Sequence, residues 1–415
     1  MYIYKVGVVG AGTMGAQIAE VVSFAGLPVV LADREEALAR RGVESVRAIY
    51  QARVAKGKMT PEQLEEKMLL VTASPNLERL HDADLVIEAV SEDLLLKQRV
   101  FQELDRICSR SAILASNTSA LSISAIGSAT KRPDKVIGLH FFNPAYAMPL
   151  VEVIPGLGTD PQTVDDVVGF SESLRKQPVI VKECAGFLVN RLLSPYLNEA
   201  VWCLQDGDVS IKEIDQDMVS FGMPVGPFTL LDTVGLDIAL DVARILHRSY
   251  GPRMAPAPLL EAFVKAGRMG LKTGKGLYDY GAAEEGGADQ HLERLRAQAR
   301  QLTGRSSMKW SPLRPLVAMV NEAVIALQEG VASARDIDFA MAAGTGFPSD
   351  KIGPLHLADQ LGIDRVLQEL EELQDRVGPR FWPAPMLRRL VDAGFTGQGA
   401  GRGFFSYEPT IARMR

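Results

Sequence analysis

The sequence predicts an α/β domain built on a doubly wound, mostly parallel sheet, followed by two tandem all-α domains. Three observations lead to this fold class. Short apolar strands alternate with helical segments in the first part of the chain, the pattern turns almost wholly helical from residue 186 onward, and this helical part repeats itself. We expect the α/β domain over residues 1–184, helical domains over 185–281 and 310–415, and a linker over 282–309.

Length and charge restrict the class of protein before any motif is considered. A chain of 415 residues with 47% hydrophobic and 23% charged residues suits a soluble protein of two or three domains. The net charge of −6 argues against nucleic acid or an anionic membrane as the main partner. No apolar run reaches the length of a membrane span, and the N-terminus has neither signal-peptide nor transit-peptide character.

The cysteines and histidines show no ligand pattern. Cys108, Cys184 and Cys203 form no CxxC pair and no plausible bridge framework, which favours a reducing compartment, so we expect a cytoplasmic protein. The five histidines are scattered without metal-ligand spacing, and no metal site is therefore expected.

The first expected strand, over residues 4–9, runs directly into a glycine motif. Gly10, Gly12 and Gly15 form G-x-G-x-x-G, and a helical pattern follows over residues 16–24. In this context Gly10 allows a tight turn, Gly12 lets the backbone approach a pyrophosphate, and Gly15 permits close packing of helix and strand. The N-terminus of the helix then holds the phosphates. The expected dinucleotide site includes Gly10, Gly12, Thr13, Met14 and Gly15.

The second expected strand, over residues 29–32, sets the choice of dinucleotide. It ends in Asp33, roughly 20 residues after the glycine motif, where an acidic side chain accepts a hydrogen bond from the ribose 2′-hydroxyl and repels a 2′-phosphate. This position favours NAD over NADP. Arg34 keeps the alternative open, because a neighbouring arginine can serve a 2′-phosphate.

A polar helical stretch over residues 35–67 interrupts the alternation. Thr60, Pro61 and Gln63 fit a capping box with proline at the first helical position, so we expect an inserted pair of helices. Basic side chains lie along it, among them Arg53, Lys56 and Lys58. They either meet a phosphate-bearing ligand or form a solvated face, and composition alone favours the solvated face.

Strands are expected again at residues 69–71, 85–88, 112–115 and 136–139, with a helix over residues 94–107. In a doubly wound sheet, the loops at the carboxyl ends of the strands form the ligand crevice. These loops carry Ser91, Glu92, Ser116, Asn117, Thr118, Ser119 and the segment 140–143.

His140 and Glu152 are the strongest candidates for an acid/base pair. His140 falls where the strand over residues 136–139 ends, and Glu152 lies inside a second apolar run over residues 150–154. A lone carboxylate is costly to bury, and a nearby imidazole is a suitable partner. The alternative is a core histidine with satisfied hydrogen bonds and an unrelated glutamate on an edge strand.

Five motifs agree, in order, with one known family. They are Gly10-Ala11-Gly12-Thr13-Met14-Gly15, Ser116-Asn117-Thr118-Ser119, Gly138-Leu139-His140-Phe141-Phe142-Asn143-Pro144, Leu150-Val151-Glu152 and Gly186-Phe187-Leu188-Val189-Asn190-Arg191. By these motifs the chain resembles the L-3-hydroxyacyl-CoA dehydrogenase family. One departure is Ala185, where the family usually has proline, and this change removes no functional group.

The resemblance implies roles for single residues. The family's catalytic positions are occupied by Ser119, His140, Glu152 and Asn190. Its cofactor-contacting positions are occupied by Asp33, Glu92, Lys97 and Asn143. The inserted helices resemble the element that meets the coenzyme A moiety, which makes Arg53, Lys56 and Lys58 candidates without singling one out.

The resemblance also implies an activity. It is the reversible, NAD-dependent oxidation of an L-3-hydroxyacyl-CoA to the 3-ketoacyl-CoA, in fatty-acid β-oxidation or a related acyl-CoA degradation, with His140 taking the hydroxyl proton. Some relatives are fused to a hydratase/isomerase domain; since nothing before Tyr2 leaves room for one, we expect the dehydrogenase alone. Two other interpretations stay open: a dehydrogenase of a sugar acid or other hydroxy acid on the same scaffold, and a non-enzymatic NAD-binding protein.

The helical part contains an internal duplication. Asn198-Glu199-Ala200 recurs as Asn321-Glu322-Ala323 at an offset of 123 residues, and after a four-residue insertion Gly226-Pro227 matches Gly353-Pro354 at an offset of 127. Asn190 maps to Leu313, so the second copy lacks the polar group expected to face substrate, and we interpret it as structural. Between the copies, residues 284–287 fit a linker and residues 290–302 a short helix.

The duplication suggests an arrangement of the two helical copies. In the family that the chain resembles, the helical domains of single-copy members pair with each other. We therefore expect the second copy to take the place of another subunit and form an internal pseudo-dimer with the first. A higher oligomer is compatible with this arrangement.

Overall fold

The computed structural model describes residues 2–281, 287–303 and 310–407. Its chain divides into two compact units, Met1–Phe187 and Leu188–Arg415. The domain boundaries expected after residues 184, 281 and 309 stay predictions. Most of the linker expected at residues 284–287 lies outside the described residues, whereas the helix expected at 290–302 is confirmed as part of α12 (Gly287–Thr303).

The first unit is built on an eight-stranded sheet with the order β3-β2-β1-β4-β5-β6-β7-β8. The strands are β1 (Val6–Val9), β2 (Val29–Ala32), β3 (Val71–Ser74), β4 (Leu85–Glu88), β5 (Ile113–Ser116), β6 (Val136–Phe141), β7 (Leu150–Pro155) and β8 (Gln177–Ile180). The strands from β3 to β6 are parallel, β7 is antiparallel to β6, and β8 is parallel to β7. The order reverses between β1 and its neighbours β2 and β4, which is where doubly wound sheets bind ligands.

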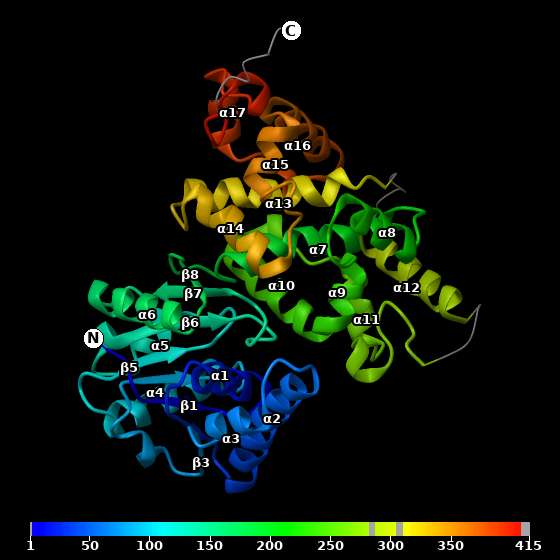
Figure 1. Ribbon diagram of the computed structural model, residues 1–415. Coiled ribbons are helices and arrows are strands. Elements are labelled where there is room, and N and C mark those ends of the chain that lie inside the picture. Colours follow the sequence, from blue (N-terminus) through cyan, green and yellow to red (C-terminus); the bar gives the residue numbers. More distant parts are fainter. Residues whose placement is uncertain (1, 282–286, 304–309, 408–415) are drawn as a thin grey trace. The chain divides into compact units, whose positions relative to one another are not determined.

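Helices cover this sheet (Figure 1). They are α1 (Thr13–Phe24), α2 (Glu36–Ala55), α3 (Pro61–Met68), α4 (Leu94–Ile107), α5 (Ile123–Gly127) and α6 (Pro161–Ser173), with short 3₁₀ turns η1 (Leu77–Leu80) and η2 (Pro133–Lys135). Every residue of β1, β4, β5 and β6 is buried. Continuous apolar strands of this kind are typical of a parallel sheet with helices on both faces.

Some expected strand bounds are wrong. The strand expected at residues 69–71 begins only at Val71, because Leu69 caps the end of α3 and is 85% exposed. The strand expected to end at Leu139 continues to Phe141, since pairing with β7 extends it. His140 therefore lies inside β6 rather than after it. The sequence patterns also gave no indication of α6 or β8.

The inserted helical pair, α2 and α3, is confirmed, and so is its capping box. The Thr60 hydroxyl accepts from the Gln63 backbone N–H at 3.2 Å, and the Gln63 side chain accepts from the Thr60 N–H at 3.0 Å. Tyr50 of α2 is fully buried against α1, where its hydroxyl lies 2.7 Å from the Ser23 hydroxyl. The insert is thus anchored to the helix that follows the glycine motif.

The second unit is all helical. Its first copy holds α7 (Val189–Asp206), α8 (Ile211–Phe221), α9 (Pro227–Val234), α10 (Leu236–Tyr250), η3 (Gly251–Met254), α11 (Pro258–Lys265) and η4 (Leu271–Thr273). The second copy holds α13 (Leu313–Gln328), α14 (Ala334–Thr345), α15 (Pro354–Leu361), α16 (Ile363–Val377), η5 (Pro379–Phe381), α17 (Pro385–Asp392) and η6 (Gln398–Ala400). The same order of elements in the two copies gives the sequence repeat its structural counterpart.

Equivalent polar contacts hold the two copies in the same shape. Asp232 accepts from the backbone N–H groups of Leu277 and Tyr278, and Asp359 accepts from those of Phe404 and Phe405. A Cβ atom on Gly276 or Gly403 would lie only 2.0 Å or 1.9 Å from the respective carboxylate. Glycine is therefore required where each chain returns past its buried aspartate.

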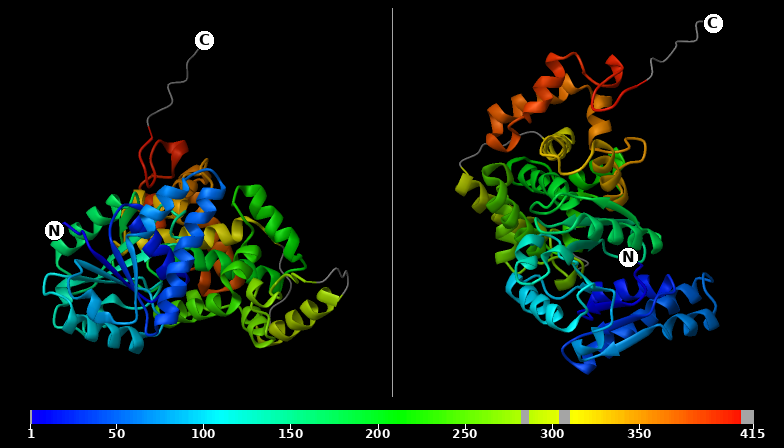
Figure 2. Two further views of the ribbon diagram at one scale, coloured as in Figure 1. Left: turned by 60° about the horizontal axis from the view of Figure 1, so that its bottom comes forward. Right: turned by 90° about the vertical axis from the view of Figure 1, so that its left-hand side faces the viewer.

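Helices α7 and α13 pack against each other within this unit (Figure 1 and Figure 2). Buried ion pairs cross their contact in a reciprocal pattern. Glu322 of α13 accepts from Arg191 at 2.7 Å and Arg253 at 3.1 Å. Glu199 of α7 accepts from Arg314 at 2.7 Å and Arg380 at 3.1 Å. Each glutamate, with its two arginines, matches the other triad through the internal repeat.

Candidate active site

His140 and Glu152 form a buried pair. They lie opposite each other across the antiparallel strands β6 and β7, with His140 Nδ1 2.7 Å from Glu152 Oε2. His140 is 5% exposed and Glu152 is fully buried. Because an ionised carboxylate only accepts hydrogen bonds, Nδ1 carries the proton and donates it, and Nε2 is the nitrogen available to accept one. The predicted pairing is in place.

Aromatic rings and one amide fix the position of this imidazole. The ring of Phe142 lies 4.6 Å from that of His140, and the ring of Phe187 lies 5.9 Å away, measured between centroids. The side-chain oxygen of Asn117, which follows β5, accepts from the Phe141 backbone N–H at 2.8 Å. Asn117 thus holds the end of β6 directly beside His140.

Ser119 and Glu92 meet in the loops after β5 and β4. The Glu92 carboxylate accepts from the Thr118 hydroxyl at 2.6 Å and from the Ser119 backbone N–H at 3.0 Å. Thr118 is buried, whereas Ser119 is half-buried and Glu92 is exposed. The glutamate therefore shapes the turn that presents Ser119.

The glycine motif forms a cradle that suits a pyrophosphate. Gly10 has a φ of +100°, and a Cβ there would lie 2.7 Å from the backbone oxygen of Ala89. A Cβ on Gly15 would lie 1.7 Å from the oxygen of Gly10, whereas a Cβ on Gly12 would meet nothing within 4 Å. Space is left at Gly12, where the backbone would meet the phosphates of a bound dinucleotide, and α1 begins directly afterwards with Thr13 and Met14. These residues fit NAD.

Asp33 stands at the end of β2 beside this cradle. Its carboxylate accepts from the backbone N–H groups of Ala11 and Arg34, both at 2.8 Å, and it is only partly buried. A cavity of about 640 Å³ is lined by Gly10, Gly12, Asp33 and Arg34, among others. Cofactor sites typically have volumes of about 300–1,000 Å³. Both Asp33, whose carboxylate favours the 2′-hydroxyl of NAD, and Arg34, whose charge favours the 2′-phosphate of NADP, line this cavity.

Lys97 is buried rather than open to solvent. Its ammonium donates to Glu88 at 2.7 Å and lies 3.4 Å from Glu92. Glu88, at the end of β4, is fully buried and also accepts from the Ser116 hydroxyl and the Val90 N–H, each at 2.6 Å. The pair ties the loops after β4 and β5 together. Lys97 thus supports the residues around the expected cofactor site.

Asn143 is exposed and is held by α1. Its side-chain oxygen accepts from Gln17 Nε2 at 3.1 Å, and the Gln17 oxygen accepts from the Ala145 N–H at 2.7 Å. Lys176 supports the same segment, donating to the backbone oxygens of Ala145 at 2.5 Å and Met148 at 2.8 Å. Burial lowers the pKa of Lys176, while Glu20 nearby opposes that shift.

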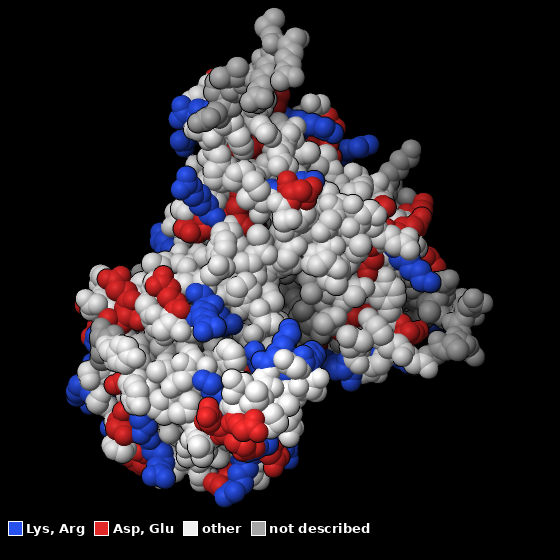
Figure 3. Space-filling model, in the orientation of Figure 1, with Lys and Arg blue, Asp and Glu red and all other residues white. Residues whose placement is uncertain are grey.

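The three candidates for coenzyme A differ in their surroundings. Arg53 lies 2.8 Å from the buried Glu20 and 4.4 Å above the Phe24 ring. Burial raises the pKa of Glu20, and the guanidinium of Arg53 counteracts the rise. Lys56 and Lys58 are exposed at the end of α2. Basic and acidic side chains are interspersed over the face shown in Figure 3, in keeping with the small net charge.

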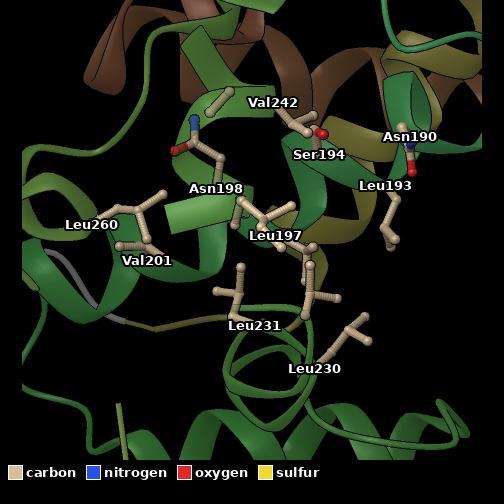
Figure 4. A pocket seen from close by; sticks show the side chains of 14 residues that line it. Asn190, Leu193, Ser194, Leu197, Asn198, Val201, Leu230, Leu231, Val242 and Leu260 are labelled. Carbon is tan, nitrogen blue, oxygen red and sulfur yellow. The ribbon is translucent and has the colours of Figure 1, made fainter. Parts of the chain in front are cut away.

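Asn190 belongs to the second unit. It lies in the first turn of α7, is half-buried, and lines a largely apolar pocket of the first helical copy (Figure 4). Its counterpart Leu313 begins α13. The polar group at this position is therefore confined to the first copy.

Sequence reasoning missed three residues that support the site: Gln17, Glu88 and Lys176. Glu88 had a readable signal, because an acidic residue ends an otherwise apolar strand. Gln17 and Lys176 had none, since each acts on a segment far away in the sequence. Among the described residues, no group of three His, Cys, Asp or Glu side chains is placed to hold a metal ion. Across the same residues, no helix has both the length and the apolar character needed to cross a bilayer.

Known proteins resemble the chain over both units. The model of the 3-hydroxyacyl-CoA dehydrogenase NAD-binding domain matches residues 5–184, and that of the C-terminal domain matches residues 186–280 and again 313–407. The fatty acid oxidation complex subunit alpha of Shewanella amazonensis is 38% identical over 398 residues, covering 95% of this chain and 56% of that protein. The chain thus spans about half the length of the curated relatives that it matches.

Solved structures agree with this result. The 3-hydroxybutyryl-CoA dehydrogenase of Escherichia coli K12 has a TM-score of 0.85 at 31% identity, covering 95% of this chain and 100% of that chain. The (S)-3-hydroxybutyryl-CoA dehydrogenase of Ralstonia eutropha has a TM-score of 0.66 at 40% identity, covering 68% of this chain and 100% of that chain. The chain therefore belongs to the 3-hydroxyacyl-CoA dehydrogenase family and carries that family's C-terminal domain twice.

Proposed function

We propose that the chain catalyses the reversible, NAD-dependent oxidation of L-3-hydroxyacyl-CoA to 3-ketoacyl-CoA, in fatty-acid β-oxidation or a related acyl-CoA degradation. The observation that carries this proposal is the buried pair of His140 and Glu152, 2.7 Å apart. It lies in the unit that also holds the glycine cradle and Asp33. Family membership supports the acyl-CoA substrate class.

His140 acts as the acid/base. Its Nε2 takes the proton of the 3-hydroxyl during oxidation and returns it during reduction. Glu152 accepts the Nδ1 proton, which fixes the tautomer and stabilises the imidazolium that forms. Since Glu152 is fully buried, its charge acts on the imidazole with little screening by water.

The remaining proposed site residues bind and orient. Bound NAD supplies the hydride acceptor. Gly10, Gly12, Thr13, Met14 and Gly15 hold its phosphates, and Asp33, Glu92, Lys97 and Asn143 place the rest of it directly or through the loops they support. We assign Ser119 and Asn190 to the oxygens of the substrate, where hydrogen-bond donors stabilise developing charge. Lys56 and Lys58, with Arg53 behind them, remain the candidates for the coenzyme A phosphates.

The proposal also covers the pairing of the two helical copies and the cellular compartment. The reciprocal ion pairs between α7 and α13 support an internal pseudo-dimer of the helical copies. The three cysteines are free, which supports a reducing, cytoplasmic setting.

The decisive experiment uses the purified chain in both directions: it follows NADH consumption with 3-keto substrates such as acetoacetyl-CoA, and NADH formation from NAD with hydroxy substrates such as 3-hydroxybutyryl-CoA. We expect turnover with the CoA thioester and none with free 3-ketobutyrate or with sugar acids, because the free acids lack the coenzyme A moiety. NADPH in place of NADH and heat-treated protein serve as controls. Turnover of free hydroxy acids at the same kcat/KM as the thioester would contradict the proposal.

A further inference from the structure

The first helical copy contains an apolar pocket whose lining suits a hydrocarbon chain. It lies wholly within the second unit, between α7, α9, α10 and α11, and has a volume of about 100 Å³. Its apolar wall includes Leu193, Leu197, Val201, Leu231, Val242 and Leu260 (Figure 4).

Two of the three polar side chains that line the pocket lie together at one end. Asn190 and Ser194 lie one turn apart at the start of α7, and Val201 and Leu260 lie on the other side of the view in Figure 4. Asn198 also lines the wall, and its amide is held by the backbone: it donates to Ala255 O and accepts from Ala257 N, both at 2.9 Å. None of the described residues that line the pocket carries a charge.

We propose that this pocket receives the acyl chain of the CoA thioester, and that it selects short to medium apolar chains and rejects chains that end in a carboxylate. The inference rests on the proposed function, in which Asn190 binds an oxygen of the substrate. A chain that starts beside Asn190 runs along α7 into the apolar end. Each methylene buried there favours binding about fourfold. A carboxylate would lose hydration there without gaining a cationic partner.

The size of the pocket limits the chain length. A dry cavity of about 150 Å³ lined by Leu, Ile and Phe accommodates benzene, so about 100 Å³ has room for a few carbon atoms. Val234 and Ile238 border the pocket and are 45% and 49% exposed. Longer chains therefore pass out over these side chains towards solvent, where further methylenes gain little.

The first test measures kcat/KM of the full chain for a series of 3-ketoacyl-CoA substrates. From acetoacetyl-CoA to 3-ketohexanoyl-CoA, which is longer by two methylenes, we expect a rise of about 15-fold, followed by a plateau between 3-ketooctanoyl-CoA and 3-ketopalmitoyl-CoA. For 3-ketoadipyl-CoA, which ends in a carboxylate, kcat/KM should lie at least about tenfold below that for 3-ketohexanoyl-CoA. Equal values across the series, or a preference for the carboxylate, would overturn the proposal.

The second test changes the pocket in opposite directions. Val242→Phe fills the pocket and should lower the ratio of kcat/KM for 3-ketooctanoyl-CoA to kcat/KM for acetoacetyl-CoA about tenfold. Leu230→Ala enlarges the pocket and should raise the ratio of kcat/KM for 3-ketododecanoyl-CoA to kcat/KM for acetoacetyl-CoA. His247→Phe, at an exposed position of the same helix, should leave both ratios unchanged. A general loss of stability moves both variants the same way, so opposite shifts identify the subsite.

The two proposals can fail separately. Turnover of acetoacetyl-CoA with ratios that neither variant alters removes the acyl-chain subsite and leaves the proposed function standing. No turnover of any CoA thioester by the unmodified chain removes both. If Val242→Phe does not fold, Ala239→Leu fills the same pocket with a smaller change and takes its place.

Discussion

At the scale of single residues, the environment of His140 determines how it should be tested. Glu152 is buried and its oxygen lies 2.7 Å from His140 Nδ1. Removing the imidazole with alanine would take the Nδ1 donor away from this buried carboxylate and would lower the stability of the fold as well as the activity. Glutamine keeps an amide donor for Glu152 and lacks only the titrating nitrogen.

We therefore expect His140→Gln to fold, to bind NADH nearly as the unmodified chain does, and to lose about 10²–10⁴-fold in turnover. Stopped assays of acetoacetyl-CoA reduction and a fluorescence titration with NADH measure the two effects. His81→Gln, at an exposed histidine, is the matched control and should retain full activity. Near-normal turnover of His140→Gln would remove this residue from the mechanism.

A second prediction at this scale concerns Asp33. Its carboxylate accepts from the Ala11 and Arg34 N–H groups and lines the large cavity of the first unit. The two N–H groups donate to different oxygens of Asp33, so Asp33→Asn keeps an acceptor for only one of them and also loses the charge. We expect kcat/KM with NAD to fall about 10- to 100-fold and that with NADP to fall less, because repulsion of the 2′-phosphate is relieved.

Arg34→Ala is the companion variant for this prediction. If Arg34 attracts the 2′-phosphate, the residual activity with NADP should fall in Arg34→Ala while that with NAD is unchanged. An NAD/NADP ratio that is the same in Asp33→Asn and in the unmodified chain would move the ribose contact to another residue.

The site was predictable from the sequence where the partners are close in the chain. His140 and Glu152 lie on adjacent strands of one hairpin, so a carboxylate expected to be buried at Glu152 already indicated His140 as its hydrogen-bond partner. The contact of Lys97 with Glu88 was not predictable, because it depends on how α4 returns against β4. The same holds for Lys176, which supports the segment after His140 from the start of β8.

At the scale of elements, hydrophobic patterning identified most strands and helices but not their ends. The bounds of α4 and β2 agree with expectation because a capping Asp93 and a terminal Asp33 mark them. The extension of β6 to Phe141 depends on hydrogen bonds from β7, which no local pattern carries. The strand β8 begins with a proline-containing polar segment, and only its place beside β7 makes it a strand.

The contact of α7 with α13 gives a prediction about pH. Burial opposes ionisation of Glu199, but Arg380 and Arg314 outweigh it and hold the pKa of this carboxyl below its ordinary value of 4.5. Between these two values the unfolded chain binds more protons than the folded one. The stability from Glu199 is therefore fully present above about pH 4.5 and is lost as the pH falls through the folded pKa.

We expect the Tm of Glu199→Gln to lie below that of the unmodified chain at neutral pH, since a neutral amide removes the charge that Glu199 presents to Arg314 and Arg380, at a cost of about 3–5 kcal/mol. The difference should shrink as the pH is lowered below about 4.5. Scanning calorimetry from neutral to acid pH measures this convergence, with Glu372→Gln at an exposed position as the control. A constant difference at every pH would show that Glu199 does not titrate in this window.

At the scale of the whole molecule, the duplication explains how the chain covers the contact face of α7 with a helix of its own second copy. Glu322 occupies in the second copy the position of Glu199 in the first, Arg314 that of Arg191, and Arg380 that of Arg253. Each copy therefore carries both halves of the contact. An interface whose two sides are related in this way is self-complementary, like that of a two-fold symmetric dimer.

The final prediction follows from this self-complementarity. A chain that ends at Thr303 loses the second copy but retains every proposed catalytic residue, while Arg191 and Glu199 become exposed together with the apolar face of α7. Such surfaces rarely stay uncovered. Two truncated chains can restore the ion pairs by placing Glu199 of each against Arg191 and Arg253 of the other, so we expect dimers with some dehydrogenase activity. Sedimentation equilibrium and the acetoacetyl-CoA assay measure both.

A charge reversal separates this pairing from nonspecific association. In the truncated chain, Glu199→Arg faces arginine with arginine and should abolish the dimer, leaving monomer or aggregate, whereas Glu66→Arg at an exposed position of α3 should leave it intact. A truncated chain that stays monomeric with an unchanged Tm and full activity would mean that the second copy is an appended domain. In that case the buried Arg–Glu triads would stabilise only the attachment of the second copy, and the first copy would not need a partner for its α7 face.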